Sequence, residues 1–352
     1  MHKIIFILLS LFTTSSFAAE LVDLYQSQQA VANQEDQETQ RVAPEILQQV
    51  LLKVVGDREV LNAANISPIL SQVDALIEQS QYRRLNKITD DLTQEDQLAL
   101  LLKFSEPGVN KALSDIGLPI WSKSRPDVMV WLVVDDGKTR RILSADDATS
   151  PVVTALNDVT ARRGLPILLP ILDLQDQNQI TATDLWAGFS EPIKKASERY
   201  AANIILTGRI TMATADQVSI RWQSLINNES EQWQSKGNVN TAVQSGIEEF
   251  TDKLARRFTQ VIASGAEQSL ALKISQVVRY TDYSRTMNYL TNLQYVSDVQ
   301  LVQFEGEKLQ VKISFKGERS VFIQTLALDH ILQEESSDGA NTSDVMLYRL
   351  LP

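Results

Sequence analysis

The chain has 352 residues, a net formal charge of −11 at pH 7 and no cysteine. Without cysteine it can form neither a disulfide nor a thiolate metal site, and it has no thiol nucleophile. The acidic charge repels phosphate backbones, and no basic stripe with interleaved aromatic residues is present, so we expect no nucleic-acid partner. A chain of this length with 43% hydrophobic residues can bury two or three hydrophobic cores.

The N-terminus predicts export. A basic residue precedes an apolar run at residues 4–12, and a stretch of small and polar residues follows at 13–19. That order is typical of a secretory signal peptide, and the small residues Ser16 and Ala18 predict cleavage after the second of them. The apolar run is shorter than the roughly 20 residues that span a bilayer. We therefore expect a signal peptide at residues 1–18 and a soluble, periplasmic mature protein without a transmembrane segment.

Residues 19–125 predict an α+β domain. Apolar rows at helical spacing follow Val42, and they indicate a helix that ends at Gly56, because glycine commonly follows the last apolar turn. The other elements expected in this segment are strands at 21–25 and 98–104 and a helix at 109–116.

Residues 126–265 predict an α/β layer. Seven consecutive apolar residues at 128–134 are typical of a strand that is buried on both faces of a sheet. Alternating strands and helices come first and a meander comes last, which indicates an antiparallel edge on the sheet. The other expected elements are strands at 167–172, 203–211, 218–225 and 232–236 and helices at 150–163, 186–200 and 243–261.

Residues 269–352 predict a ferredoxin-like unit with the order β-α-β-β-α-β. Apolar and polar residues alternate at 309–315, which indicates a strand with one buried face. The chain as a whole is therefore expected to combine α/β and α+β folds in three small domains. The other elements expected here are strands at 270–274, 296–304 and 345–350, helices at 282–290 and 320–332, and a loop at 333–343.

Two adjacent carboxylates, Asp135 and Asp136, follow the apolar run of the middle segment. At the mouth of a parallel sheet such a pair can bind a divalent metal ion or serve a carboxylate-dependent hydrolase. Asp136 and Gly137 also form a hairpin signature before a second short strand, since Asp-Gly supplies the positive φ of a tight turn. We expect the turn, and metal-binding catalysis at these two residues is the alternative.

Histidine chemistry is nearly excluded. His2 lies in the expected signal peptide, and His330 is then alone on a helix, where we expect it on the solvent side. A Ser-His-Asp triad needs its histidine beside both partners, and zinc sites usually need two or more histidine or cysteine ligands. The chain also has no phosphate-binding loop and no dinucleotide fingerprint. We expect no catalytic residue and no cofactor, and a protein that is not an enzyme.

Four pairs of adjacent arginines are spread along the chain, and two of them are Arg162-Arg163 and Arg256-Arg257. Such pairs suit salt bridges or the acidic surface of a partner. Because charged side chains usually lie in solvent, we expect solvent-exposed faces at these positions.

Several stretches together resemble a proteobacterial family of exported proteins known only as a domain of unknown function. The stretches are a helix ending in Val54-Val55-Gly56, then Leu118-Pro119-Ile120-Trp121, and the run from Arg125-Pro126 to Asp135-Asp136-Gly137. The resemblance covers nearly the whole mature chain and implies a protein of the Gram-negative envelope. It implies no catalytic residue.

The middle segment by itself is similar to the N-terminal domain of the periplasmic Tol-system propeller protein and to curli-secretion-type lipoproteins. The similarity rests on the order of elements that ends in residues 202–210 and a meander. Those proteins are assembly and binding modules. This chain lacks their lipidated cysteine and their propeller, so the similarity implies the module alone.

These observations predict a non-catalytic, periplasmic accessory protein that binds another envelope protein. The third segment offers the contact surface, because a ferredoxin-like sheet has one face covered by helices and one face free. Lys308, Lys312 and Lys316 should lie on that free face, opposite the apolar residues of the same strand.

Overall fold

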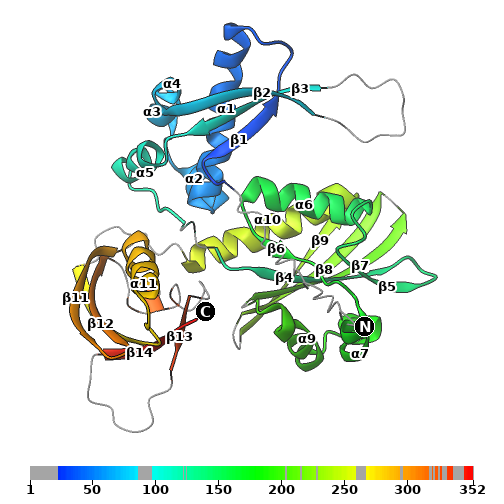
Figure 1. Cartoon of the computed structure of the whole chain (residues 1–352). Helices are drawn as coiled ribbons and strands as arrows, with labels where there is room; N and C mark the ends of the chain where they lie inside the picture. Colours follow the sequence, from blue (N-terminus) through cyan, green and yellow to red (C-terminus); the bar gives the residue numbers. More distant parts are fainter. Residues whose placement is uncertain are drawn as a thin grey trace, which may run out of the picture.

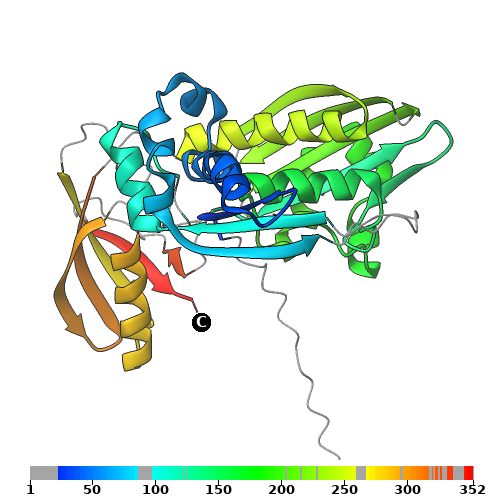
Figure 2. The same ribbon diagram turned by 90° about the horizontal axis from the view of Figure 1, so that it is seen from above.

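The structure is a computed structural model, and Figures 1 and 2 show it in two views. It describes residues 23–85, 97–121, 123, 125–202, 204–214, 216–226, 229–258, 267–293, 296–316, 319, 322, 323, 326, 331–335 and 345–351. The expected signal peptide lies outside these residues. Helices and strands combine in three separate sheets, so the expected mixture of α/β and α+β folds is confirmed.

The first sheet is antiparallel and has the order β1-β3-β2. Its strands are β1 (Gln26–Ala30), β2 (Ile77–Leu85) and β3 (Gln97–Phe104). The long helix α1 (Asp36–Val55) covers one face, and Gly56 ends it in the left-handed conformation as predicted. The helices α2 (Arg58–Ala63), α3 (Ser67–Leu70), α4 (Val73–Leu76) and α5 (Glu106–Asp115) complete this part.

The strand expected at 21–25 begins later than predicted, at Gln26. The Asp23 side chain accepts a hydrogen bond from the Tyr25 backbone N–H at 3.0 Å, so a turn takes the place of the strand start. Residues 21 and 22 lie outside the described residues.

The middle sheet has the order β5-β4-β7-β8-β9, and a short β6 also pairs with β4. Strand β4 (Val128–Asp135) is parallel to β7 (Ile204–Thr214), and a meander continues through β8 (Gln217–Ile226) and β9 (Glu229–Gly237). The expected layer with an antiparallel edge is therefore present. The two remaining strands are β5 (Arg140–Leu143) and β6 (Ile167–Leu168), so the strand predicted at 167–172 is much shorter than expected.

Helices cover both faces of this sheet, which explains the uninterrupted apolar run of β4. Val130 and Leu132 pack under α6 (Pro151–Arg163) and α10 (Val239–Phe258), whereas Met129, Trp131 and Val133 pack with the opposite layer. The helices of that opposite layer are α7 (Leu174–Gln179), α8 (Ala182–Ala187) and α9 (Ser190–Ser197), followed by the 3-10 turn η1 (Glu198–Tyr200).

The single helix expected at 186–200 is wrong. Gly188 takes the left-handed conformation at the end of α8, and Phe189, expected on the buried row, is 56% exposed. Helical spacing continued across the break in the sequence, but a left-handed residue cannot continue a right-handed helix.

The third sheet has the order β11-β12-β10-β14-β13. Its strands are β10 (Glu267–Ser275), β11 (Val296–Glu305), β12 (Lys308–Lys316), β13 (Leu332–Glu334) and β14 (Val345–Leu350), and α11 (Tyr280–Asn292) lies between β10 and β11. Residues on α11 share one core cluster with Phe322, Leu326 and the inner faces of β10 and β12, so α11 and these two residues cover the same face of the sheet.

This sheet departs from a ferredoxin-like unit in one respect. Residues 332–334 form the added strand β13, where a helix end and a loop were expected, and the chain then turns back into β14. Strand β14 consequently runs parallel to β10, whereas a ferredoxin-like sheet would be antiparallel there. Most of the expected loop, residues 336–343, lies outside the described residues.

A buried, charged junction joins the first two sheets, and in Figure 2 the helices α1, α6 and α10 lie next to one another there. Arg163 on α6 is only 1% exposed, and its Nη2 donates to Asp252 Oδ1 on α10 at 2.7 Å and to the Gly56 carbonyl at 2.5 Å. Asp252 also accepts from Arg58 Nε at 2.8 Å. The expected solvent-exposed face is thus wrong for Arg163, because two neighbouring units meet over it.

Candidate functional site

The two carboxylates at the end of β4 form a turn, as expected. Asp135 Oδ1 accepts from the Gly137 N–H at 2.9 Å, and Asp135 Oδ2 accepts from Arg140 Nε at 2.7 Å. Asp136 Oδ1 accepts from the backbone N–H groups of Lys138 and Thr139 at 2.9 and 2.8 Å. Strand β5 then pairs antiparallel with β4, which completes the hairpin.

The electrostatics of this turn follow from the same bonds. The Gly137 N–H and the Arg140 guanidinium hold the pKa of Asp135 below its usual value, and the backbone N–H groups of Thr139 and Lys138 do the same for Asp136. A lowered pKa keeps both groups ionised and makes them weak proton donors. The arrangement is that of two hydrogen-bond acceptors which close a tight turn.

Within the described ranges no group of three or more histidine, cysteine, aspartate or glutamate side chains could hold a metal ion. His330, which we expected on the solvent side of a helix, lies outside those ranges. No helix in the described part of the chain is long and apolar enough to cross a membrane.

Strand β12 has the register predicted for it. Val311 and Ile313 are fully buried with their neighbours Leu309 and Phe315, whereas Lys308 and Lys312 are exposed. The side chain of Lys316 lies outside the described part of the chain. The sheet therefore has one apolar face under the helices and one polar face on which the described part of the chain places no helix.

The polar face carries charges of both signs rather than lysines alone. In the register of the sheet, Lys308 is the partner of Glu305 on β11, and Lys312 is the partner of Gln300. Lys273 on β10 lies opposite Gln310 and adds another cation. The lysines are thus part of a mixed polar surface beside β11.

Strand β11 forms the outer edge of the third sheet, at the far left of Figure 1. It carries three large apolar side chains in solvent: Leu301 is 48% exposed, Val302 55% and Phe304 48%. Val302 is the extra residue of a bulge between Leu301 and Gln303. Exposed apolar residues that cluster on an edge strand are typical of protein contact sites.

Aromatic residues extend this apolar edge onto α11. The rings of Phe304 and Tyr283 lie 6.3 Å apart in an edge-to-face arrangement, and those of Tyr283 and Tyr280 lie 6.2 Å apart. Tyr280 is 81% exposed. We call Tyr280, Tyr283, Leu301, Val302 and Phe304 the β11 patch.

Apart from the short, polar strand β1, the other edge strands of the described sheets are protected in the ways that natural edges usually are. Strands β5 and β13 have only four and three residues. Strands β2 and β9 are long but mostly polar, with Arg83 and Arg84 on β2 and Glu229 and Glu231 on β9. The β11 patch is therefore an exception that the fold does not explain.

The sequence predicted a contact surface on this same sheet but did not single out its edge. The available signal was the adjacent pair Leu301-Val302, because in a strand one of two neighbours must point away from the core. This pair does not indicate the order of the strands, and it is the strand order that makes β11 the outermost strand.

Residues 18–122 match the family model of a domain of unknown function, DUF8605. This agrees with the resemblance to an uncharacterised family, although the match spans the first part of the chain rather than nearly all of it. Among solved structures, the C-terminal domain of LpoB from Salmonella enterica matches with 15% identity and a TM-score of 0.22, covering 36% of this chain and 89% of that one. No curated protein matches the chain. The similarity of the middle segment to Tol and curli modules stays a prediction.

Proposed function

We propose that this protein is an exported, non-catalytic accessory protein of the Gram-negative cell envelope that binds another envelope protein through the edge of its third sheet. The observation that carries the proposal is the β11 patch, where exposed apolar side chains lie on an edge strand. Partner strands or loops commonly bind at such edges, where main-chain hydrogen bonds add to side-chain contacts. The order of residues at the N-terminus supports export.

The partner's chemistry follows from the surroundings of the patch. Its centre must bury Leu301, Val302 and Phe304, which requires apolar side chains on the partner. Lys308 and Lys312 lie on the neighbouring strand, exposed to solvent, and they are the proposed contacts for carboxylates at the rim. Lys316 is proposed for the same role. Charges at a rim mainly affect association rate and specificity.

A carboxylate-dependent hydrolase at Asp135 and Asp136 receives less support. All four carboxylate oxygens already accept hydrogen bonds from the turn or from Arg140, three of them at 2.7 to 2.9 Å and Asp136 Oδ2 from the Thr139 hydroxyl at 3.4 Å. Such a pair is positioned for structure, and a substrate or metal ion would have to displace these bonds.

A photo-crosslinking amino acid at position 302, in the full-length protein in its own cells, tests the proposal. We expect a discrete adduct with one envelope protein, which mass spectrometry identifies. The matched control is position 232 on β9, another exposed edge strand. The substitution Val302→Lys, with the crosslinker moved to position 304, should reduce the adduct. An equal yield of the same adduct at positions 302 and 232, or no envelope protein at 302, would contradict the proposal.

A further inference from the structure

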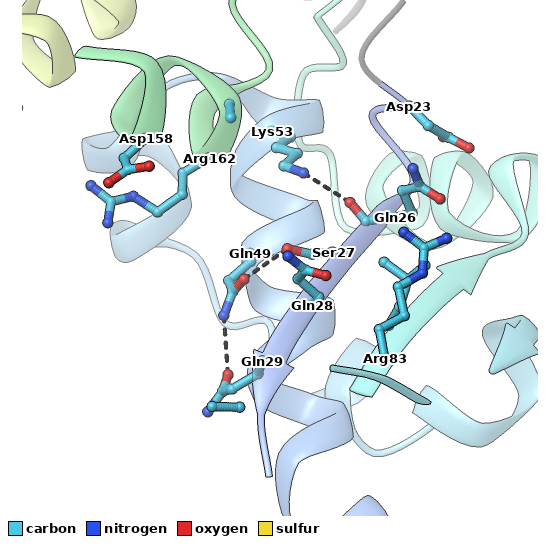
Figure 3. Close-up of a pocket in the computed structure, with 13 residues that line it drawn as sticks. Asp23, Gln26, Ser27, Gln28, Gln29, Gln49, Lys53, Arg83, Asp158 and Arg162 are labelled. Carbon is cyan, nitrogen blue, oxygen red and sulfur yellow. Dashed lines mark hydrogen bonds between the residues drawn. The ribbon is translucent and has the colours of Figure 1, made fainter. Parts of the chain in front are cut away.

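A polar hollow of about 820 Å³ lies beside β1, in the first sheet, far along the chain from the β11 patch. Figure 3 shows it between β1 and α1 on one side and α6 on the other. Leu101 and Arg83 from the neighbouring strands also line it, so the hollow extends around the edge of β1 to the uncovered face of the sheet.

The backbone of β1 faces this hollow with open hydrogen-bonding groups. The Tyr25 carbonyl and the Val31 N–H bond to β3, so the odd-numbered residues of the strand point their backbone groups toward β3. In an antiparallel pair the even-numbered residues then point the other way. Strand β1 is an edge strand, and on its open side Lys53 Nζ donates to the Gln26 carbonyl at 2.8 Å. Gln28 and Ala30 have no strand partner on that side within the described residues.

Three cationic side chains line the hollow: Lys53, Arg83 and Arg162. None of the three has a carboxylate partner within 4 Å among the residues that the structure describes, although most arginines of the junction are paired. Of the two carboxylates in the lining, Asp23 is already 3.1 Å from Lys103 Nζ. The hollow therefore offers positive charge in a chain whose net charge is −11.

Lys53 is the most informative of these residues. It is only 6% exposed, and one backbone carbonyl is its hydrogen-bond partner, although an ammonium group has three donors. Burial lowers the pKa of Lys53 to about 8, and the nearby Arg125 acts in the same direction while Asp23 opposes it. A buried ammonium group with unused donors destabilises the fold unless an anion completes its coordination.

We propose that this hollow binds an extended peptide segment of a partner protein, which adds to the free edge of β1 and offers a carboxylate side chain to Lys53 and Arg162. The edge supplies main-chain hydrogen bonds, and the cations select an acidic segment. A sugar would be the other polar ligand to consider, but none of the described lining residues is aromatic, so a sugar ring has no surface on which to stack. The site is independent of the β11 patch and gives the protein a second contact.

The probe is a library of random peptides of about ten residues displayed on phage, long enough to pair along the five residues of β1. Panning uses the full mature chain, and enriched peptides are synthesised for binding measurements. We expect enrichment of aspartate and glutamate, and weakening of about tenfold or more when that carboxylate is replaced by an amide. N-methylation of alternate peptide amides should abolish binding.

Three variants of the protein complete the test. Gln28→Pro removes an outward N–H while sparing the β1–β3 ladder, since edge strands accept proline there, and it should abolish binding without unfolding the protein. Arg162→Glu should weaken binding about tenfold or more, whereas Lys236→Glu, an exposed cation on β9, should not. Lys53→Met should weaken binding while raising stability. The proposal would be overturned if no peptide is enriched or if the enriched peptides lack acidic residues. It would also be overturned if the peptides bind Gln28→Pro and Arg162→Glu as tightly as they bind the wild-type protein.

Discussion

Arg163 and Asp252 form an ion pair inside the protein, with 2.7 Å between Nη2 and Oδ1 and almost no exposure of either side chain. The two residues lie on α6 and α10 of the middle unit, and both reach the first unit, through the Gly56 carbonyl and the Arg58 guanidinium. Arg256 adds a parallel contact, donating from Nε to Asp57 Oδ2 at 2.5 Å. The two units are therefore held together by ion pairs, of which the Arg163–Asp252 pair is removed from water.

Asp252→Asn is expected to destabilise the protein strongly. The substitution removes the negative charge shared by Arg163 and Arg58 and leaves a buried guanidinium without compensation, which costs about 3–5 kcal/mol. Chemical denaturation should show this loss, and the first unit should become more sensitive to protease. Asp146→Asn, an exposed carboxylate before α6, should stay within about 0.5 kcal/mol of the wild type. Equal stability of the two variants would show that the pair does not hold the junction.

Val311→Asp and Lys312→Glu test the register of β12. The first places an unpaired charge in a fully buried position and should unfold the third unit. The second changes an exposed side chain and should alter the free energy of unfolding by no more than about 0.5 kcal/mol. Thermal unfolding followed by circular dichroism distinguishes them. A stable Val311→Asp with an unfolded Lys312→Glu would mean that the faces are inverted.

The stability of the protein should depend on pH through Lys53. Its pKa is about 8 in the folded protein against an ordinary value of 10.5. Between pH 8 and 10.5 the unfolded chain binds more protons than the folded one, so the free energy of unfolding rises with pH in this window. The full effect amounts to about 3 kcal/mol.

Lys53→Met should remove that rise and increase stability at pH 7 by roughly 1–3 kcal/mol, because the desolvated charge is gone while one hydrogen bond is lost. Urea denaturation of both proteins at pH 7 and pH 10 measures the difference. If the free energies of unfolding of the two proteins change in parallel with pH, Lys53 is not the titrating group.

Asp135→Asn combined with Asp136→Asn should leave the melting temperature nearly unchanged, because asparagine keeps the turn and an ion pair with Arg140 at the surface contributes little to stability. Magnesium or calcium titrated into the wild-type protein should not raise the melting temperature, whereas a bound ion must raise it. If the metal raises the melting temperature of the wild-type protein and the double variant abolishes this rise, Asp135 and Asp136 form a metal site rather than only a turn.

Export predicts a defined N-terminus for the mature protein. Signal-peptide cleavage after Ala18 or Ala19 leaves a protein that begins at Ala19 or Glu20 and fractionates with the periplasm. N-terminal sequencing of the protein purified from its own cells makes the measurement. A protein that retains Met1 would exclude this form of export.

The sequence by itself determined the features that depend on neighbouring residues. The Asp136-Gly137 hairpin, the glycine that ends α1 and the alternating faces of β12 all follow from local geometry, so they could be predicted. The break in the helix at Gly188 was not predicted, because the helical spacing of apolar residues continued on both sides of it.

Tertiary structure decided the features that depend on distant parts of the chain. Whether Arg163 lies in solvent or in a core depends on the approach of Gly56 and Asp252, which are 107 and 89 residues away in sequence. The direction of β14 depends on the added strand β13. The exposure of Leu301, Val302 and Phe304 depends on the position of β11 as the outermost strand among the described residues. Strand order and the burial of a charged residue such as Arg163 are properties of the assembled sheets, and no local pattern of residues specifies them.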